Sequence, residues 1–411
     1  MARSYTNSVY SIFSKGYSLS AMHLLPRNLL RLLIICMILG MLFIGLYPFN
    51  YFSPNQVSVN EDGSGLHFHG RGIAYSTGDS AWPEDGNSDS PLTLELMLNP
   101  ERSYNRGIPH ILSLCDVSGR EVMYLGQWKS SLIVRLMENG LGVEKIKREI
   151  DHGDVLNPGE PVAITLVLNV GSADIYVNGQ LVKEASGFDF AEAVSKRPVR
   201  SLVLGNASNG DSPWRGTIWS FSAFDGALSP TEILKRFEQW GSGSRPGSGE
   251  EFIKYRLEKP AGGVVGNQAG NGWNLIIPDT LVPLHWEFLA MPSRQFLQKR
   301  HFYKDAIVNV VGFIPLGLAL SIFFTQVPSE KNSWKNLLYP ILAGGLLSLF
   351  IETNQVFLVS RSSYLTDLVL NILGTGIGMG IWWGKDLLLR NETRLPLTQI
   401  TEDSEKSSEC R

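Results

Sequence analysis

Six polar residues lie within or beside apolar stretches in the last third of the chain. Their spacing places them in pairs on single helix faces: Asp305 with Asn309, Glu352 with Gln355, and Asp367 with Asn371. A charged side chain deep in a bilayer costs at least about 2.5–3.5 kcal/mol on insertion scales, so a carboxylate there is a functional-site candidate by default. The chemistry open to Glu352 or Asp367 is proton transfer as a general acid or base.

Arg361 is the only basic residue between the last two apolar stretches. It is the natural partner for Glu352 or Asp367, because a buried charge is usually paired and hydrogen-bonded. Its planar guanidinium also suits a phosphate group. The alternative is structural, since polar bonds between membrane helices hold them together at about 1 kcal/mol each. The residues leave both interpretations open.

Proline and glycine predict how these helices pack. The last apolar stretch has two overlapping GxxxG spacings, formed by Gly374 with Gly378 and by Gly376 with Gly380. Such spacings are typical of closely packed membrane helices. Pro315, followed closely by Gly317, predicts a kink that frees a backbone carbonyl in the helix before it.

Four apolar stretches approach the roughly 20 residues needed to cross a hydrocarbon core of about 30 Å. They cover residues 32–49, 306–325, 337–359 and 364–384. The first follows a basic leader, residues 1–31, and has no small-residue cleavage site, so we expect a retained anchor rather than a signal peptide. The sequence therefore predicts a polytopic α-helical membrane domain with four transmembrane helices.

The charges around these stretches predict the orientation. The leader contains basic residues and no Asp or Glu, which favours a cytoplasmic N-terminus. Four spans return the tail, residues 385–411, to the same side. The basic residues Arg294, Lys299, Arg300 and Lys304 disagree, but they end a long translocated segment, where the rule has less weight. We expect a multi-pass protein of the cell membrane with both termini in the cytoplasm.

The segment between the first two spans is polar, rich in glycine and interrupted by turns. Short stretches such as residues 92–98 and 163–168 alternate apolar and polar residues, which indicates antiparallel strands. Asn178-Gly179 lies between β-rich flanks and is the strongest short signal for a hairpin. We therefore expect an all-β sandwich outside the membrane.

Four segments of this region resemble LamG-like or concanavalin A-like jelly-roll domains. They are residues 65–70, 175–180, 216–219 and 224–233, the last with Ser229 and Glu232 spaced as a helix capping box. The resemblance covers roughly residues 57–240. It implies a jelly roll, inserted after the first helix, of a kind that often binds glycans or protein partners.

The resemblance also raises the question of metals, because relatives that bind sugars often hold calcium with clustered carboxylates. We can assign no such carboxylate set in this sequence. His67 and His69 share a strand face but have no third ligand, so we predict no metal site from them. No E-x-D-x-E run is present to supply two carboxylates in one groove, and hydrolysis of glycosides is therefore not expected.

Residues 241–304 are expected to be a linker and interfacial segment. Residues 241–249 are a flexible Gly-Ser linker by composition, which would end the sandwich. Residues 281–290 and 296–303 mix aromatic and basic side chains, as is typical of a membrane interface. Ordinary packing against the sandwich is the alternative.

The polar pairs of the membrane domain, taken with their neighbours, resemble the VanZ-like family over residues 305–384. The matching residues are Asp305, Asn309, Gly312, Phe313 and Pro315-Leu316-Gly317, then Ser348, Glu352, Gln355 and Phe357, then Arg361-Ser362-Ser363, Asp367, Asn371 and Gly374. The family is named for a protein associated with glycopeptide (teicoplanin) resistance. The resemblance implies a role at envelope glycans or lipid-linked intermediates without defining a reaction. The inserted sandwich departs from the compact family members.

Composition excludes several other functions. The net charge of −3 gives no basic field for nucleic acid, and the three cysteines lie too far apart for a zinc site or a disulfide framework. No P-loop, HExxH or GxSxG motif is present. We therefore expect a membrane protein that binds glycan, a lipid-linked intermediate or another envelope protein at the outer face. The alternative is a non-catalytic adhesion or scaffold protein, with a transporter third; whether the chain is an enzyme stays open.

Overall fold

A computed structural model describes residues 26–392, except 52, 61, 83–89, 141–142, 242–250, 259, 271, 292–299, 327–333 and 359–360. The chain forms two compact units. A helical unit takes residues 1–47, 288–355 and 363–411, and a β-sandwich unit takes residues 48–287 and 356–362. Most of the basic leader and the end of the tail, for which we expect a cytoplasmic location, lie outside the described residues.

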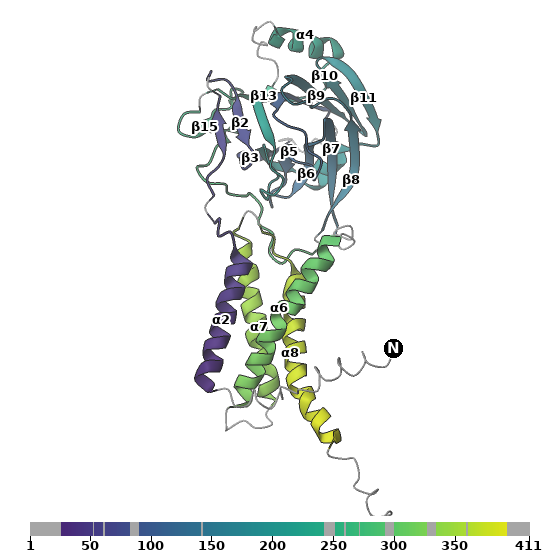
Figure 1. Cartoon of the computed structure of the whole chain (residues 1–411). Helices are drawn as coiled ribbons and strands as arrows, with labels where there is room; N and C mark the ends of the chain where they lie inside the picture. Colours follow the sequence, from purple (N-terminus) through teal and green to yellow (C-terminus); the bar gives the residue numbers. More distant parts are fainter. Residues whose placement is uncertain are drawn as a thin grey trace, which may run out of the picture. The chain divides into compact units, whose positions relative to one another are not determined.

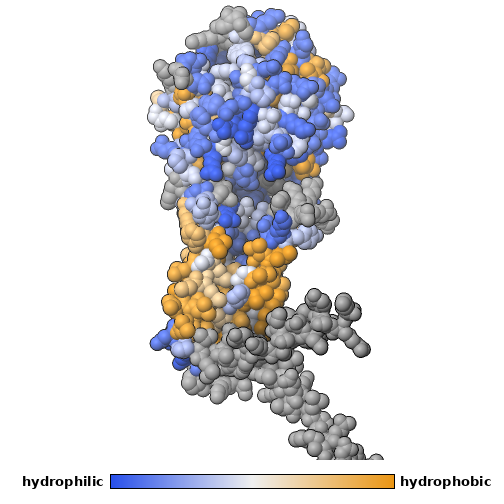
Figure 2. Space-filling view, in the orientation of Figure 1, coloured by the Kyte–Doolittle hydropathy of each residue, from blue (hydrophilic) through white to orange (hydrophobic). Residues whose placement is uncertain are grey.

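In the part of the chain that the structure describes, the helical unit has four long helices, which Figure 1 shows running alongside one another. They are α2 (Arg27–Leu46), α6 (Arg300–Thr325), α7 (Lys335–Gln355) and α8 (Leu365–Glu392). Each contains a window long and apolar enough to cross a membrane. Apolar side chains predominate on the face of this unit that Figure 2 shows, and Leu346 and Val308 are 65% and 64% exposed. Such outward-facing apolar residues suit contact with lipid.

The helix bounds differ from the apolar stretches by a few residues. α2 begins at Arg27, directly after Pro26, and ends at Leu46, two residues before Pro48. Proline disfavours helical geometry in the residue before it, which explains the early end. α7 ends at Gln355 rather than at 359. A span defined by hydropathy includes apolar residues that follow the end of the helix and leaves out polar residues that belong to the helix.

Glycines bring α6 and α8 into close contact. A Cβ added at Gly374 would lie 2.2 Å from the carbonyl oxygen of Val310, and one at Gly378 would lie 2.1 Å from that of Ile314. Gly317 approaches α8 in the same way. Gly376 and Gly380 have nothing within 4 Å of an added Cβ, so the second predicted GxxxG spacing does not serve this interface.

The β-sandwich unit consists of two eight-stranded antiparallel sheets, which confirms the predicted fold class. The first sheet has the order β1-β2-β13-β4-β9-β10-β11, and β14 also pairs with β13. Its strands are β1 (Val57–Val59), β2 (Leu66–His69), β4 (Leu92–Pro100), β9 (Val162–Asn169), β10 (Ser172–Val177), β11 (Gln180–Ser186), β13 (Arg215–Asp225) and β14 (Glu251–Arg256).

The second sheet has the order β15-β16-β3-β12-β5-β6-β7-β8. Its strands are β3 (Ala74–Trp82), β5 (His110–Cys115), β6 (Glu121–Trp128), β7 (Ser131–Gly140), β8 (Val143–His152), β12 (Val199–Leu204), β15 (Val264–Val265) and β16 (Leu275–Ile276). Among its described residues, this unit also contains two shorter helices, α3 (Phe190–Lys196) and α4 (Pro230–Gly241). Inward-facing side chains of both sheets form one core, in which Trp214, Phe68 and Phe221 are fully buried.

Two short features predicted from the sequence, a hairpin turn and a helix capping box, are present in the structure. Asn178 and Gly179 join β10 to β11 with φ of 52° and 80°, both positive, as a two-residue hairpin turn requires. The side chain of Glu232 accepts hydrogen bonds from the backbone N–H and the hydroxyl of Ser229 at 2.9 and 2.7 Å, and Ser229 Oγ accepts from the N–H of Glu232 at 3.3 Å. This capping box begins α4.

The expectation that the sandwich ends at residue 240 is wrong. β14 pairs with β13 along residues 220–224, and β15 and β16 extend the second sheet beside β3. In β14, Ile253 and Tyr255 are fully buried. The Gly-Ser composition correctly indicates a break, but the alternating pattern of residues 251–256 returns the chain to the sheet.

The chain enters and leaves the sandwich side by side. The N–H of Asn55 donates to the carbonyl of Asp279 at 3.0 Å, and the N–H of Leu281 donates to that of Ser53 at 2.9 Å. Pro54 and Thr280 form the antiparallel bridge between them. Beyond this point, Leu281 packs in a small cluster with Ile73, Cys115 and Val203 on the outer face of the second sheet.

Candidate functional site

Glu352 is the most deeply buried carboxylate of the helical unit. Its side chain is on α7 and the residue is 2% exposed. Oε2 accepts a hydrogen bond from the backbone N–H of Tyr364 at 3.0 Å, and the Ser363 hydroxyl also bonds to this carboxylate. Ser363 in turn accepts from the N–H of Leu289 through its hydroxyl oxygen. The start of α8 and the segment before α6 therefore enclose Glu352.

Asp367 lies on α8 close to the α7 carboxylate. The Asn309 side chain on α6 hydrogen-bonds to Asp367. The Asp367 carboxylate also interacts electrostatically with those of Asp305 and Glu352. Asp305 is exposed, whereas Asp367 and Asn309 are half-buried. The three helices therefore bring together Asp305, Asn309, Glu352 and Asp367, four residues that are widely separated in the sequence.

Asn371 and Gln355 have separate partners. The Nδ2 of Asn371 donates to Ser348 Oγ at 2.9 Å inside the α7–α8 interface, and both residues are buried. Its Oδ1 has no hydrogen-bond partner among the described residues. Gln355 Nε2 donates to the carbonyl of Gly45 on α2 at 2.9 Å. Gln355 therefore attaches the first helix to the third.

Arg361 belongs to the β-sandwich unit, whereas Glu352 and Asp367 belong to the helical unit. Within its own unit, its backbone N–H donates to the carbonyl of Leu358 at 2.9 Å, and its side chain is exposed. The pairing of Arg361 with a membrane carboxylate stays a prediction. Pro315 lies inside α6, which continues through it.

His67 and His69 are adjacent in space, but their nitrogens contact other groups. Their ring centroids lie 4.3 Å apart. His67 places Nε2 3.2 Å from Glu101 and Nδ1 2.9 Å from Thr217 Oγ1, and His69 Nε2 lies 2.8 Å from Ser58 Oγ. No three His, Cys, Asp or Glu side chains among the described residues are placed to hold a metal ion. Calcium in the sandwich stays a prediction from the resemblance alone.

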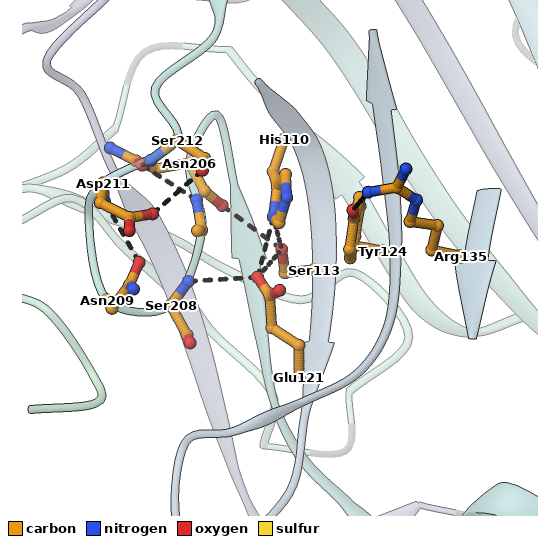
Figure 3. Close-up of polar contacts among 11 residues, drawn as sticks. His110, Ser113, Glu121, Tyr124, Arg135, Asn206, Ser208, Asn209, Asp211 and Ser212 are labelled. Atoms are coloured by element: carbon orange, nitrogen blue, oxygen red, sulfur yellow. Dashed lines mark hydrogen bonds and ion pairs between the residues drawn. The ribbon is translucent and has the colours of Figure 1, made fainter. Parts of the chain in front are cut away.

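A buried polar group lies where β5 and β6 meet in the second sheet (Figure 3). His110 Nδ1 lies 2.8 Å from Oε1 of Glu121 and 3.1 Å from Ser113 Oγ. The Ser113 hydroxyl donates to the same Oε1 at 2.7 Å, and the Ser208 N–H does so at 3.4 Å. Burial alone would raise the pKa of Glu121, but His110, Ser113 and Ser208 hold the pKa below its ordinary value.

Strand register extends this group across the sheet. Ser113, Tyr124, Arg135 and Glu149 are paired in turn from β5 to β8, so they form one row on the face that points away from the core. Arg135 Nη1 donates to the Tyr124 hydroxyl at 2.8 Å, and its Nε pairs with Glu149. Burial raises the pKa of Tyr124 to about 12, so its hydroxyl stays neutral. The His110 ring stacks on Tyr124 with centroids 3.7 Å apart.

An open groove of about 570 Å³ lies over this face of β5–β8. Its lining includes His110, Tyr124, Trp128, Arg135, Glu149 and Asp151. Asp151 is two residues after Glu149 on β8, so both carboxylates face the groove. A Cβ at Gly126 would lie 2.5 Å from Ile108, so this glycine allows the loop before β5 to cross the sheet and close one side.

The arrangement suits binding rather than nucleophilic catalysis. In a catalytic triad, the histidine contacts serine through one ring nitrogen and the acid through the other. Here Ser113 and Glu121 both contact Nδ1. The groove instead combines one exposed aromatic side chain, Trp128, with polar groups that are already held by hydrogen bonds and ion pairs.

None of the residues that line this groove was predicted from the sequence. Each strand contributes one or two of them, and no spacing along the chain connects His110 with Glu149. Alternation does indicate which face each residue occupies, but only the register of four strands aligns them in a row.

Two family models match the chain. Residues 76–234 match the concanavalin A-like lectin/glucanases superfamily, and residues 260–390 match VanZ/LLP1. No curated protein matches.

Solved structures match about half of the chain with low similarity. A protein from Bacteroides ovatus described as carbohydrate-binding is 16% identical, with a TM-score of 0.36, over 54% of this chain and 60% of that one. The binding domain of botulinum neurotoxin DC in complex with rat synaptotagmin II is 14% identical, with a TM-score of 0.36, over 45% and 46%. Botulinum neurotoxin type C, whose cell entry is described as dependent upon interaction with two ganglioside molecules, is 13% identical, with a TM-score of 0.33, over 45% of each chain.

The chain thus spans between 45% and 60% of the length of these solved structures. Its two matched segments, the two sheets and the four long apolar helices agree on one domain organisation. This is a membrane protein in which a concanavalin A-like β-sandwich precedes a VanZ-like segment.

Proposed function

We propose that the chain is a multi-pass protein of the cell envelope whose β-sandwich binds glycan in the groove over β5–β8 on the outer face of the membrane. The groove itself is the observation that carries this proposal. Trp128 is 36% exposed there and offers an aromatic face, whereas Tyr124, also in the lining, is 4% exposed and lies under the His110 ring. Aromatic faces pack on the C–H faces of sugar rings and bury apolar area with little loss of side-chain freedom.

The polar groups of the groove are fixed before a ligand arrives. Arg135 is held by Tyr124 and Glu149, and His110 is held by Glu121 and by stacking. Nε2 of His110 has no partner among the described residues, and its ring lines the groove. Preorganised groups lose little entropy when they bind hydroxyls, which supports recognition of a polyol. The match to a lectin and glucanase superfamily supports the same ligand class.

Binding to envelope glycan can be measured with the full-length protein in detergent and isolated peptidoglycan sacculi, by co-sedimentation. Trp128→Ala and Asp151→Asn are expected to weaken binding about tenfold each, because each removes a direct contact worth about 1–1.5 kcal/mol. Val117→Ala is the matched control, since Val117 is 85% exposed on the same unit and outside the groove. Equal binding by all four proteins would refute the groove.

We propose further that the acidic residues of the helical unit hold a lipid-linked or amphiphilic envelope component and contribute to glycopeptide resistance. Glu352 supports this proposal, because its carboxylate is 2% exposed between membrane helices. Burying a carboxylate there costs free energy, and such residues usually have a function. Glu352→Gln and Asp367→Asn are expected to lower teicoplanin resistance in cells, whereas Thr353→Ala, at an exposed neighbour, leaves it unchanged. Unchanged resistance with normal levels of folded protein would contradict this role.

The alternative is a scaffold that only displays the sandwich. Removing residues 54–280 and joining Ser53 to Leu281 separates the two, because these ends are already hydrogen-bonded neighbours. Resistance that survives this deletion but not Glu352→Gln assigns the function to the helices. Resistance that is lost in the deletion but kept in Glu352→Gln assigns it to the displayed sandwich.

The orientation is tested separately with single cysteines in a background without Cys36, Cys115 and Cys410. Arg361→Cys and Ser248→Cys are expected to react with an impermeant maleimide in intact cells, and Ser333→Cys is not. Ser248 and Ser333 lie outside the described residues. Reaction only at Ser333→Cys would place the sandwich in the cytoplasm and refute binding at the outer face.

A further inference from the structure

A second cavity lies on the other sheet, between helix α4 and the outer face of β4, β9, β13 and β14. It holds about 370 Å³. Pockets for small ligands usually measure about 300–1,000 Å³, so this one has room for one or two sugar rings. Residues 235–258, which supply the end of α4 and all of β14, follow the segment that matches the superfamily model. The cavity is therefore partly built by chain beyond that match.

The floor of the cavity is set by strand register. Arg256, Ser220, Met97 and Ala163 are paired in turn across four strands, and Lys254, Ser222, Glu95 and Thr165 form the next row. The intervening residues Phe221 and Tyr255 point into the core and are fully buried. The outward rows therefore present hydroxyls and charges to the cavity.

The roof is one face of α4. Ile233, Arg236, Phe237 and Trp240 line the cavity and are spaced as one helical stripe. Trp219 is the extra residue of a bulge in β13, where the register shifts between Ile218 and Ser220. A bulge redirects a side chain. The Trp219 and Trp240 ring centroids lie 5.9 Å apart, at an angle of 50°.

Of the three basic side chains that line the cavity in the described part of the chain, Arg236 and Lys254 are paired with carboxylates and Arg256 is not. Arg236 bonds Glu95 at 2.8 Å and Glu251 at 3.2 Å, and Lys254 bonds Glu251 at 2.9 Å. Burial raises the pKa of Glu95, and Arg236 opposes this rise. The Arg256 residue is half-buried in the lining, and its side chain has no hydrogen bond or ion pair among the described residues.

We propose that this cavity is a second binding site, which takes an acidic saccharide such as a uronic acid. The sugar ring packs against Trp219 and Trp240, the hydroxyls of Ser220 and Thr165 bond to its hydroxyls, and Arg256 pairs with its carboxylate. A guanidinium pairs with a planar carboxylate through two parallel hydrogen bonds. Glu258 also lines the cavity but is exposed at the rim, where solvent and salt screen its charge.

This site is independent of the groove over β5–β8, because no residue lines both. The two would also prefer different ligands. Arg135 in the groove is already paired with Glu149, whereas Arg256 in the cavity is available to an anion. A failure of one site therefore says nothing about the other.

The test compares cellobiouronic acid with cellobiose, which differ only at C6 of one ring, a carboxylate in the acid and a hydroxymethyl group in cellobiose. Binding to the full-length protein in nanodiscs is measured by calorimetry. The wild-type protein is expected to bind the acid about tenfold more tightly, as one charge-assisted pair predicts. Arg256→Gln should remove this preference while leaving cellobiose binding unchanged. Arg71→Gln is the control, because Arg71 is exposed and lines neither site.

Trp240→Ala should abolish binding of both sugars at this site, with circular dichroism and thermal unfolding confirming that the variant is folded. Trp128→Ala, in the groove, should leave the preference for the acid intact. Three results would overturn the proposal: no saturable binding of cellobiouronic acid, an equal preference in Arg256→Gln and wild type, or loss of the preference in Trp128→Ala.

Discussion

The two units bury polar side chains in different ways. In the sandwich, Glu121 is 6% exposed and accepts hydrogen bonds from His110, Ser113 and Ser208. In the helical unit, Asn371 is 4% exposed and uses its amide nitrogen on Ser348, while its oxygen has no partner among the described residues. In the sheet, three donors bond to the buried acid. In the helix pair, only the nitrogen of the buried amide has a hydrogen-bond partner among the described residues.

The difference reflects how each architecture brings groups together. Strand register aligns side chains from many parts of the chain, so several donors reach one acceptor. Membrane helices have no hydrophobic force between them in lipid and rely on close packing, which Gly374 and Gly378 supply here. Close backbones leave room for few polar side chains. Loss of the hydrogen-bonding partner of a buried acid should therefore be costly in the sandwich, and a methyl group added at a close-packed glycine should be costly in the helices.

The largest effect is expected for Glu121→Ala. Breaking a buried, hydrogen-bonded pair typically costs about 3–5 kcal/mol, because His110 and Ser113 lose their shared partner. Urea unfolding followed by tryptophan fluorescence should show the loss. Glu149→Ala is the control, since that side chain is 39% exposed and its pair with Arg135 is worth at most about 1 kcal/mol. Equal losses for both variants would break the comparison.

Gly378→Ala should destabilise the helical unit by about 1–3 kcal/mol, because the new methyl group overlaps the carbonyl of Ile314. Gly376→Ala, on the same helix with open space around it, should be neutral or stabilising by up to about 1 kcal/mol through helix propensity. Thermal unfolding in detergent measures both. If Gly376→Ala proved the more damaging variant, the assigned α6–α8 interface would be wrong.

Ser348→Ala should cost about 1 kcal/mol, the usual value of a polar bond between membrane helices. It removes the only hydrogen bond of the Asn371 side chain among the described residues. The double variant with Asn371→Ala then measures the coupling, and additive losses would show that the two side chains do not interact. The single loss should stay well below that of Glu121→Ala, which sharpens the contrast between the units.

The smallest effect concerns pH. Burial lowers the pKa of His67, and His69 lowers it further. A folded-state pKa below the unfolded value means that the unfolded chain binds the proton more readily, so stability is present above about pH 6.5 and falls as the pH drops below it. His67→Gln should flatten this part of the profile of unfolding temperature against pH. An unchanged slope would assign the dependence to other groups.

Structural features that depend on residues close together in the sequence were predicted correctly. The hairpin at Asn178-Gly179, the capping box at Ser229 and the four apolar helices all depend on residues within a few positions of one another. Both resemblances, to LamG-like and VanZ-like proteins, are matched by family models.

Features that depend on distant pairing could not be read from the sequence. β14 joins the sheet because β13 has an open edge there, and nothing in residues 251–256 identifies that edge. Gly374 and Gly376 look alike in the sequence, but only the helix rotation decides which of them faces α6. The groove over β5–β8 and the cavity under α4 each need the register of four strands.

The segments at residues 53–55 and 279–281 are paired with each other, so the sandwich is inserted into the chain at a single point. Its two ends are neighbours in an antiparallel bridge, about 5 Å apart at their Cα atoms. A folded domain with ends this close can be gained or lost in one step, because the flanking chain needs only a short turn to close the gap. Replacing the inserted sandwich would therefore change the domain that is attached to the same four helices, without changing the points at which the chain enters and leaves it.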